Sequence, residues 1–279
     1  MCGRYASARK RLELLEEFRV ERDRVQAPLE PDYNVAPTKP VYAVVTREER
    51  ELRVVRWGLV PFWAKDPKIG SRLINARAET VAAKPAFRHA FKRRRCLLPA
   101  DGYYEWQRPD GSSTDAAGGG RGGAAKQPYF ITRGDGRPLA FAGLYELWRD
   151  PALPEDHERA QLWTATIITT SAPDDLGRIH DRMPMVIDPA RWPDWLDQAY
   201  DDPAGLVALL APAASSGLIS YPVSTVVNSV RNNGPELMKR IDVGQESRGP
   251  DRNARGVAPL QSGSATTQGA SGSAPGDLL

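Results

Sequence analysis

The chain has 279 residues, of which 41% are hydrophobic and 26% charged, so it can bury a sizeable core and has the composition of an ordinary globular protein. Its 38 basic and 35 acidic residues leave a net charge of +3, so any nucleic-acid contact must come from a local basic patch. Two cysteines, Cys2 and Cys96, exclude a disulfide scaffold. No segment resembles a signal peptide or membrane span, which predicts a cytoplasmic protein with reduced thiols.

The N-terminal residues predict a helix followed by a loop. Ser7 is placed to cap a helix over residues 8–18, because a serine hydroxyl can accept a hydrogen bond from the first turn. Three apolar side chains would share the inward face of this helix: Leu12, Leu15 and Phe18. Residues 26–40 contain four prolines and are predicted to form a loop.

Runs rich in β-branched and aromatic residues predict strands over most of the remaining chain. These runs span residues 41–47, 51–57, 96–106 (as strand, turn and strand), 128–132, 138–144 and 162–170, and the segments 218–224 and 228–237 close the fold. The first two indicate a hairpin, and the Gly-Asp-Gly sequence at 134–136 fits a turn. Helical segments are predicted at 74–80, 189–198 and 203–211, and a helical turn followed by a strand within 172–187. Many short strands with few helices predict a β-rich α+β fold, built on a closed or half-closed barrel.

Two segments differ in composition from the rest of the chain. Residues 109–127 are rich in Gly, Ala and Ser and are interpreted as a flexible insertion loop, because strand-like sequence resumes after them. Residues 244–279 carry almost no large apolar side chains, so they cannot offset the entropy of ordering and are predicted to be disordered. The folded domain is therefore expected over residues 2–243.

Cys2 has the most specific chemistry in the sequence. Methionine aminopeptidases remove Met1 when the second residue is small, which would leave Cys2 with an α-amine and a thiol on adjacent carbons. An α-amine has a pKa near 8, so roughly a tenth of it is neutral at pH 7 and can attack an aldehyde to form a Schiff base. The thiol can then close onto the imine carbon as a five-membered thiazolidine. The alternative is a second-position cysteine that arose by chance.

Two titratable residues are candidates for a role beside this cysteine. Glu105 lies between Tyr104 and Trp106, and a carboxyl among aromatic rings tends to have a raised pKa suited to proton transfer. An exposed strand residue beside core neighbours is the alternative. His180 could act as an acid, a base or an electrostatic stabiliser, or could be a surface histidine in a loop.

The remaining candidates could position a substrate or contact a nucleic acid. Asn75, Arg77 and Glu79 alternate in a way that could hold a substrate, although Asn75 could equally cap a helix. Trp63 could stack on a base or be a core side chain. Phosphates could be met by Arg4, Arg77, Arg182 and the basic stretch 84–95, which could otherwise be a solvated surface.

Seven motifs in this order resemble the SOS response-associated peptidase (SRAP) family. They are MCGRYA at 1–6, YNVAPT at 33–38, WGLVPFWAKD at 57–66, INARAET at 74–80, CLLPADGYYEW at 96–106, IHDRMP at 179–184 and NSVRNNGPEL at 228–237. The resemblance covers residues 2–243 and implies a single β-rich domain with a barrel-like sheet core and peripheral helices.

The resemblance implies a sensor that crosslinks itself through Cys2 to abasic sites in single-stranded DNA, including sites at single-strand/duplex junctions. It implies supporting catalytic roles for Asn75, which would hold the amine, Glu105, which would move protons, and His180, which would act on the sugar oxygen. The DNA-contacting positions that it implies are Arg4, Asn34, Trp63, Arg77, Lys84, Thr169 and Arg182. No metal, cofactor or membrane partner is expected. The protein is expected to be a cytoplasmic monomer that lies on the nucleoid when it is bound to DNA.

Two other functions stay open at this point. A cysteine peptidase would use Cys2, His180 and Glu105 as a nucleophile, acid and base, and its action could be limited to removing its own Met1. A non-covalent single-strand binding protein would use the same basic and aromatic residues, with Cys2 inert.

Overall fold

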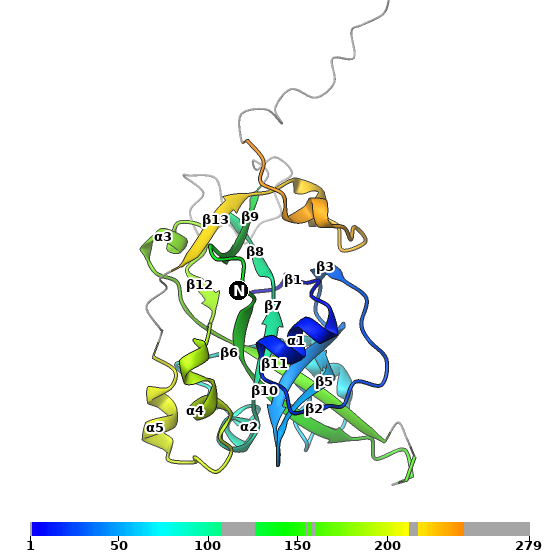
Figure 1. The fold of residues 1–279 in the computed structure, drawn as a ribbon. Coiled ribbons are helices and arrows are strands. Elements are labelled where there is room, and N and C mark those ends of the chain that lie inside the picture. The colour runs from blue at the N-terminus through cyan, green and yellow to red at the C-terminus, as the bar shows by residue number, and fades with distance from the viewer. Residues whose placement is uncertain (1, 108–125, 155, 158–159, 212–216, 243–279) are drawn as a thin grey trace, which may run out of the picture. The chain divides into compact units, whose positions relative to one another are not determined.

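Five strands close into a barrel in the order β11-β10-β7-β4-β5, with β5 pairing back to β11 (Figure 1). They are β4 (Pro40–Thr46), β5 (Arg50–Trp57), β7 (Arg95–Ala100), β10 (Leu139–Arg149) and β11 (Gln161–Ser171). The pairing that closes the ring is parallel, and the other four are antiparallel. The predicted barrel is therefore confirmed, and so is the hairpin, as β4 and β5.

This computed structural model describes residues 2–107, 126–154, 156–157, 160–211 and 217–242. All elements given below belong to one unit of the chain, which ends at Ile241. The insertion loop expected at 109–127 lies almost wholly outside the described residues, and the tail expected at 244–279 lies outside them entirely. Both stay predictions, as does the boundary at residue 243.

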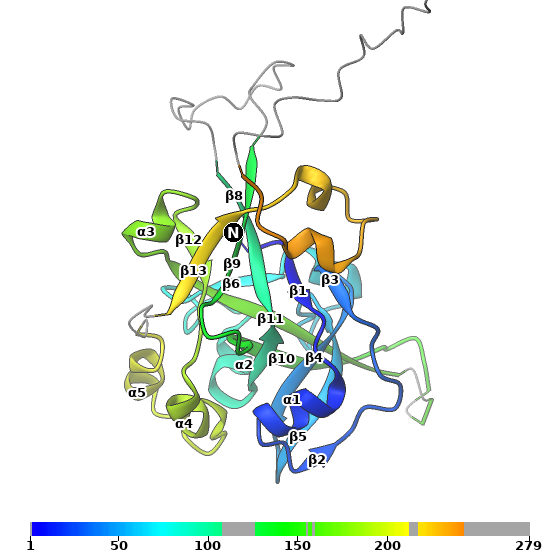
Figure 2. The same cartoon turned by 45° about the horizontal axis from the view of Figure 1, so that its top comes forward.

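Alternate side chains of the barrel strands fill its interior, as the period of two along a strand requires. The interior cluster includes Val41, Ala43, Val45, Val55, Trp57, Cys96, Leu98, Phe141, Tyr145, Ala165 and Ile167. The intervening residues of the same strands point outward. Four helices cover them (Figure 2): α1 (Arg11–Glu17), α2 (Arg88–Arg93), α4 (Trp192–Leu196) and α5 (Pro203–Ala208).

A second, antiparallel sheet of five strands covers one end of the barrel. Its order is β13 (Leu218–Pro222), β9 (Gln127–Arg133), β8 (Gly102–Gln107), β1 (Tyr5–Ser7) and β3 (Asp32–Val35). Tyr5 packs edge-on against the barrel residues Trp57 and Phe141, with ring centroids 5.2 and 5.7 Å apart. The turn predicted at 134–136 is present, but the two strands that it joins, β9 and β10, belong to different sheets.

Short elements complete the unit. They are β2 (Arg22–Asp23), β6 (Asn75–Arg77), β12 (Arg182–Pro184), α3 (Asp174–Gly177) and the 3-10 turns η1 (Pro67–Arg72), η2 (Pro189–Arg191), η3 (Thr225–Asn228) and η4 (Pro235–Met238). The turns η3 and η4 contribute Val227 and Leu237 to a small cluster on the outer face of the second sheet.

The predicted helix over 8–18 begins later than expected, and its predicted cap is wrong. Ser7 is the last residue of β1 and pairs with Asp32 of β3, and Lys10, three residues further on, occupies the N-cap position instead. The helix begins at Arg11, and Leu14 and Phe18 point inward while Leu12 is 71% exposed. Leu15 also packs against this core, so the predicted inward face is wrong at Leu12 alone.

The helix predicted over 74–80 is also wrong. Asn75–Arg77 form β6, which pairs in parallel with β11 so that Asn75 lies opposite Ile167 and Arg77 opposite Thr169. The pairing of β5 with β11 ends at Ala165, and β6 continues the parallel pairing along β11 from Ile167. The exposed edge of β11 offers backbone hydrogen bonds that outweigh local helix propensity, and the local sequence carries no sign of that edge.

Candidate functional site

Cys2 lies at the barrel end that the second sheet covers. It belongs to the interior cluster and is fully buried, with a free thiol. The next residues run alongside β8: the backbone N–H of Tyr104 donates to the Arg4 carbonyl at 2.9 Å, and Tyr5 lies opposite Tyr103. Burial, and to a smaller extent the neighbouring Glu105 carboxylate, raise the pKa of the Cys2 thiol well above its usual value.

Asn75 holds the backbone of Cys2. Its Nδ2 donates to the Cys2 carbonyl oxygen at 2.7 Å, across 73 residues of sequence. Its Oδ1 is buried and has no hydrogen-bond partner among the residues that the structure describes. A buried acceptor without a donor is costly, so this oxygen is suited to receive a hydrogen from a group that arrives at the site.

Glu105 lies on β8, two residues after Tyr103, so the two side chains share the face turned toward the barrel. Its side chain is only 5% exposed, and burial raises its pKa to about 7. At neutral pH the carboxyl is therefore present in both protonation states, and it can donate or accept a proton.

His180 lies between α3 and β12, and its ring is oriented through Nδ1. That nitrogen lies 3.0 Å from the backbone N–H of Arg182 and 2.8 Å from the Asp181 carboxylate. The two contacts exclude each other, because Nδ1 accepts from Arg182 only when unprotonated and pairs with Asp181 only when protonated. Since Asp181 is 85% exposed, we assign the backbone bond to the neutral ring, which places its proton on Nε2.

A small cavity brings Glu105 and His180 together. Tyr103 and Arg182 also line it, and its apolar walls are Ile131, Ala172, Leu176, Ile179 and Met183. The four predicted catalytic residues therefore gather at one end of the barrel. The Cys2 carbonyl accepts a hydrogen bond from Asn75, and Cys2 lies beside Glu105, which shares this cavity with His180. Sequence reasoning does not identify Tyr103, although its place two residues before Glu105 is the signal that could have found it.

The predicted DNA-contacting residues differ in exposure. Trp63 is 51% exposed, and Arg77 and Lys84 are also exposed. Asn34 and Thr169 are buried, at 0% and 1%. The exposed three can meet a ligand directly, whereas the buried two can act only through the residues that they hold.

Both remaining arginines hold other parts of the chain. Arg182 donates to both oxygens of Glu79 at 2.5 and 3.0 Å and to the Thr169 carbonyl at 2.6 Å. Arg4 donates to Asn34 Oδ1 at 2.7 Å and to the carbonyl of Val227 at 3.0 Å. These bonds fix both guanidinium groups in place, so any charge that they present to a ligand is pre-positioned.

The described residues include no group of three or more His, Cys, Asp or Glu side chains placed to bind a metal ion. Within the same residues, no helix is long and apolar enough to cross a lipid bilayer.

These features define a β-barrel protein whose second residue, a cysteine, is held beside an amide and a carboxyl that titrates near neutral pH. A model of the family "SOS response associated peptidase (SRAP)" matches residues 1–230, and the chain belongs to this family.

The relatives of the chain bear out this assignment. Abasic site processing protein YoqW of Bacillus subtilis (strain 168) is 38% identical over 86% of this chain and 99% of the relative. Abasic site processing protein HMCES of Gallus gallus is 34% identical over 88% of this chain and 79% of the relative. Abasic site processing protein YedK of Escherichia coli (strain K12) is 33% identical over 86% of this chain and 100% of the relative. The crystal structure of a protein from Bacteroides thetaiotaomicron aligns with a TM-score of 0.72 and 25% identity, covering 86% of this chain and 100% of that one.

Proposed function

We propose that this protein processes abasic sites in single-stranded DNA by bonding covalently to them through Cys2. Relatives that match most of this chain are named abasic site processing proteins. The observation that carries the proposal is the hydrogen bond of 2.7 Å from Asn75 Nδ2 to the Cys2 carbonyl oxygen, which holds the second residue beside Glu105. A terminal amine fixed in this place meets a group that can exchange protons with it.

The reaction begins when removal of Met1 frees the α-amine of Cys2. The neutral amine adds to the C1′ aldehyde of the ring-opened abasic sugar and gives a carbinolamine. Glu105 donates a proton to the departing hydroxyl, water leaves, and the nitrogen gives up a proton as the imine forms. The Cys2 thiol then adds across the imine: sulfur bonds to C1′, and the thiol proton goes to nitrogen. One water is released overall, and the product is a thiazolidine.

Asn75 and His180 support these steps. Asn75 Oδ1, the buried acceptor without a donor, receives a hydrogen from the Cys2 amine and directs the nitrogen lone pair toward the sugar. A proton on Nε2 of His180 stabilises the sugar oxygen while the ring opens. The thiazolidine also protects the strand, because an open imine would promote β-elimination and strand cleavage.

DNA is held by the exposed residues around the site. Arg77 and Lys84 meet phosphates, and Trp63 stacks beside the missing base, which favours single strands and single-strand/duplex junctions. Arg4 and Arg182 contribute positive charge from fixed positions, whereas Asn34 and Thr169 act through the contacts that they make to those arginines. We expect a monomer acting in the cytoplasm, on the nucleoid when bound.

A cysteine peptidase is less well supported than this reaction. A peptidase needs a thiolate at neutral pH, and burial raises the pKa of the Cys2 thiol well above its usual value. The amine route uses the thiol only as a late, intramolecular nucleophile.

The first experiment incubates the protein with a single-stranded oligonucleotide that carries one abasic site, followed by heating and gel electrophoresis. Wild type and Cys96→Ala, which removes the other buried thiol, should form a heat-stable adduct, and Cys2→Ala should not. Peptide cleavage without an adduct would support the peptidase instead, and a gel shift without an adduct would support a non-covalent binding protein.

A further inference from the structure

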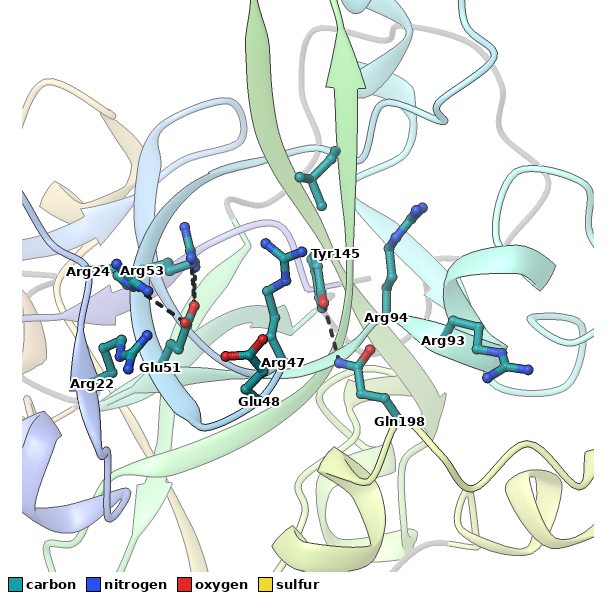
Figure 3. Close-up of a pocket in the computed structure, with 11 residues that line it drawn as sticks. Arg22, Arg24, Arg47, Glu48, Glu51, Arg53, Arg93, Arg94, Tyr145 and Gln198 are labelled. Atoms are coloured by element: carbon teal, nitrogen blue, oxygen red, sulfur yellow. Dashed lines mark hydrogen bonds and ion pairs between the residues drawn. The ribbon is translucent and has the colours of Figure 1, made fainter. Parts of the chain in front are cut away.

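A second cluster of charged residues lines a cleft of about 580 Å³ (Figure 3). Six of its lining residues are arginines, against two glutamates, Glu48 and Glu51. The arginines come from β2 and the residue after it, the β4–β5 turn, β5, and the last residue of α2 with the one that follows: Arg22, Arg24, Arg47, Arg53, Arg93 and Arg94. None of them belongs to the site around Cys2.

The cleft lies at the barrel end opposite Cys2. Its residues Glu51 and Arg53 belong to the first half of β5, whereas Trp57, the last residue of that strand, packs against Tyr5 beside the site. Six residues of strand separate Glu51 from Trp57, which is roughly 20 Å at the usual rise per residue. Ligand bound in the cleft therefore cannot touch the groups that act on the abasic sugar.

The arginines are distributed across the cleft and do not converge on one point. In Figure 3, Arg22 and Arg24 lie toward one end, Arg93 lies at the other, and Arg47 lies between them. Arg47 is exposed, and its side chain has no hydrogen-bond or ion-pair partner among the described residues. A row of separate positive charges fits the repeating phosphates of a strand better than it fits a single small anion.

Several arginines have carboxylate partners, but these contacts are replaceable. Arg22 pairs with Glu49 at 2.7 Å and Arg93 with Asp201 at 2.8 Å, and each of these four side chains is between 42% and 58% exposed. Exposed ion pairs contribute little to stability and are screened by salt, so a phosphate can displace the carboxylate. Arg24 and Arg53 share Glu51, and Arg94 binds the buried Glu146, which holds these three in place.

We propose that this cleft binds the phosphodiester backbone of a nucleic-acid strand, beyond the nucleotides held at the Cys2 end. All six cations are arginines, whose planar guanidinium groups can bond phosphate through two hydrogens at once. The aromatic residue of the cleft, Tyr145, is only 3% exposed and stacks on Trp163, so it offers no surface to a base. Binding is therefore independent of sequence. The inference rests on the proposed function for the identity of the strand.

The test measures binding of undamaged single-stranded oligonucleotides of two lengths over a range of salt concentrations. The shorter one fits the Cys2 end alone, and the longer one is several times that length. The variant Arg47→Gln/Arg93→Gln removes two cleft charges, and Arg47→Gln alone serves if the double variant is unstable. Arg137→Gln is the matched control, because Arg137 is 51% exposed and pairs with Glu17 at 2.7 Å outside the cleft.

We expect the double variant to bind the longer oligonucleotide several-fold more weakly than wild type and Arg137→Gln do. For the double variant, the slope of log affinity against log salt concentration should be smaller in magnitude by about 1.4. This is about 0.7 for each phosphate that the variant no longer neutralises. Affinity and slope equal to those of the control would overturn the proposal. So would competition by tripolyphosphate as strong as that by the oligonucleotide, because the cleft would then be a small-anion site. Undamaged DNA cannot crosslink, so failure of the Cys2 chemistry would appear separately, as loss of crosslinking by wild type.

Discussion

Glu105 shows how the fold sets the chemistry of a single residue. Its sequence neighbours Tyr104 and Trp106 point to the other face of β8, where the Tyr104 hydroxyl donates to the Tyr33 carbonyl and the Trp106 indole donates to Asn228. Burial on the barrel side is what raises the pKa of Glu105 to about 7. A carboxyl with that pKa can give up a proton in one step and take one up in the next, as the proposed reaction requires.

Replacing Glu105 with glutamine should slow crosslinking by roughly 100-fold, because in the proposed reaction this carboxyl supplies the proton for loss of water. Wild-type crosslinking should depend on pH with an apparent pKa near 7, and this dependence should be absent from the variant. The measurement is the rate of adduct formation between about pH 5 and pH 9. An unchanged rate and pH profile in Glu105→Gln would remove this residue from the mechanism.

The same residue should affect stability. Since the pKa of Glu105 is raised from 4.5 to about 7 on folding, the folded state holds the proton more tightly, and stability falls as pH rises through this window. Glu105→Gln should remove this loss, so at pH 8 the variant should be more stable than wild type by roughly 1–3 kcal/mol. Urea denaturation at pH 4.5 and pH 8 measures the difference. An advantage for wild type that grows with pH would contradict this sign.

At the scale of elements, β11 organises the site. It pairs with β6 on one side and β12 on the other, which places Arg77 opposite Thr169 and Arg182 opposite Ser171. The guanidinium of Arg182 then reaches Glu79, just beyond β6. Two short strands are held in register by one long strand, and this pairing, rather than local sequence, places their charged residues.

Strands with strong patterns could be predicted from the sequence, and those that depend on a partner could not. The runs at 41–47, 51–57 and 162–170 form β4, β5 and β11, because β-branched residues suit a buried strand wherever it lies. The segment 74–80 has no such pattern, and its first residues form a strand only because β11 offers an edge. The motif containing Asn75 is recognisable in the sequence, but its bond to Cys2 follows from this pairing alone.

The buried amide of Asn34 ties the segment after β13 to β3. Its Nδ2 lies 3.3, 3.0 and 2.9 Å from the carbonyls of Val227, Ser229 and Asn232. Asn34→Ala should lower the free energy of unfolding by about 2–4 kcal/mol, since it removes the donor to the Ser229 and Asn232 carbonyls and the buried acceptor of Arg4. Hydrogen exchange in 226–232 should also rise.

Asn233→Ala is the matched control for this change. Asn233 also binds the backbone, donating to the Pro31 carbonyl at 3.1 Å, but it is exposed, so water can replace it and the loss should stay below about 1 kcal/mol. Equal losses in the two variants, measured by chemical denaturation, would show that burial of Asn34 is not what holds the segment.

At the scale of the whole molecule, the barrel separates two ends with different chemistry. The second sheet covers one end and places Cys2, Asn75, Glu105 and His180 there. The arginine cleft lies at the other. The order of seven motifs is enough to predict a barrel-like fold and the residues of the first end. The cleft draws its arginines from separate segments, which the pairings of β2 with β5, β5 with β4 and β4 with β7 bring together, so no local pattern could reveal it.

Covalent bonding through the α-amine and thiol of Cys2 is tested by the intact mass of the crosslinked protein, measured with and without borohydride treatment. We expect an adduct whose mass equals the protein without Met1 plus the abasic oligonucleotide, less one water. Borohydride should leave this mass unchanged, because a thiazolidine has no C=N bond. Cys2→Ala keeps an α-amine after Met1 is removed but has no thiol to close the ring. Its adduct should therefore survive only after borohydride has reduced the imine, which adds two hydrogens to the mass of the imine adduct. A wild-type adduct that retains Met1, or that gains two hydrogens under borohydride, would rule out thiazolidine formation at the Cys2 amine.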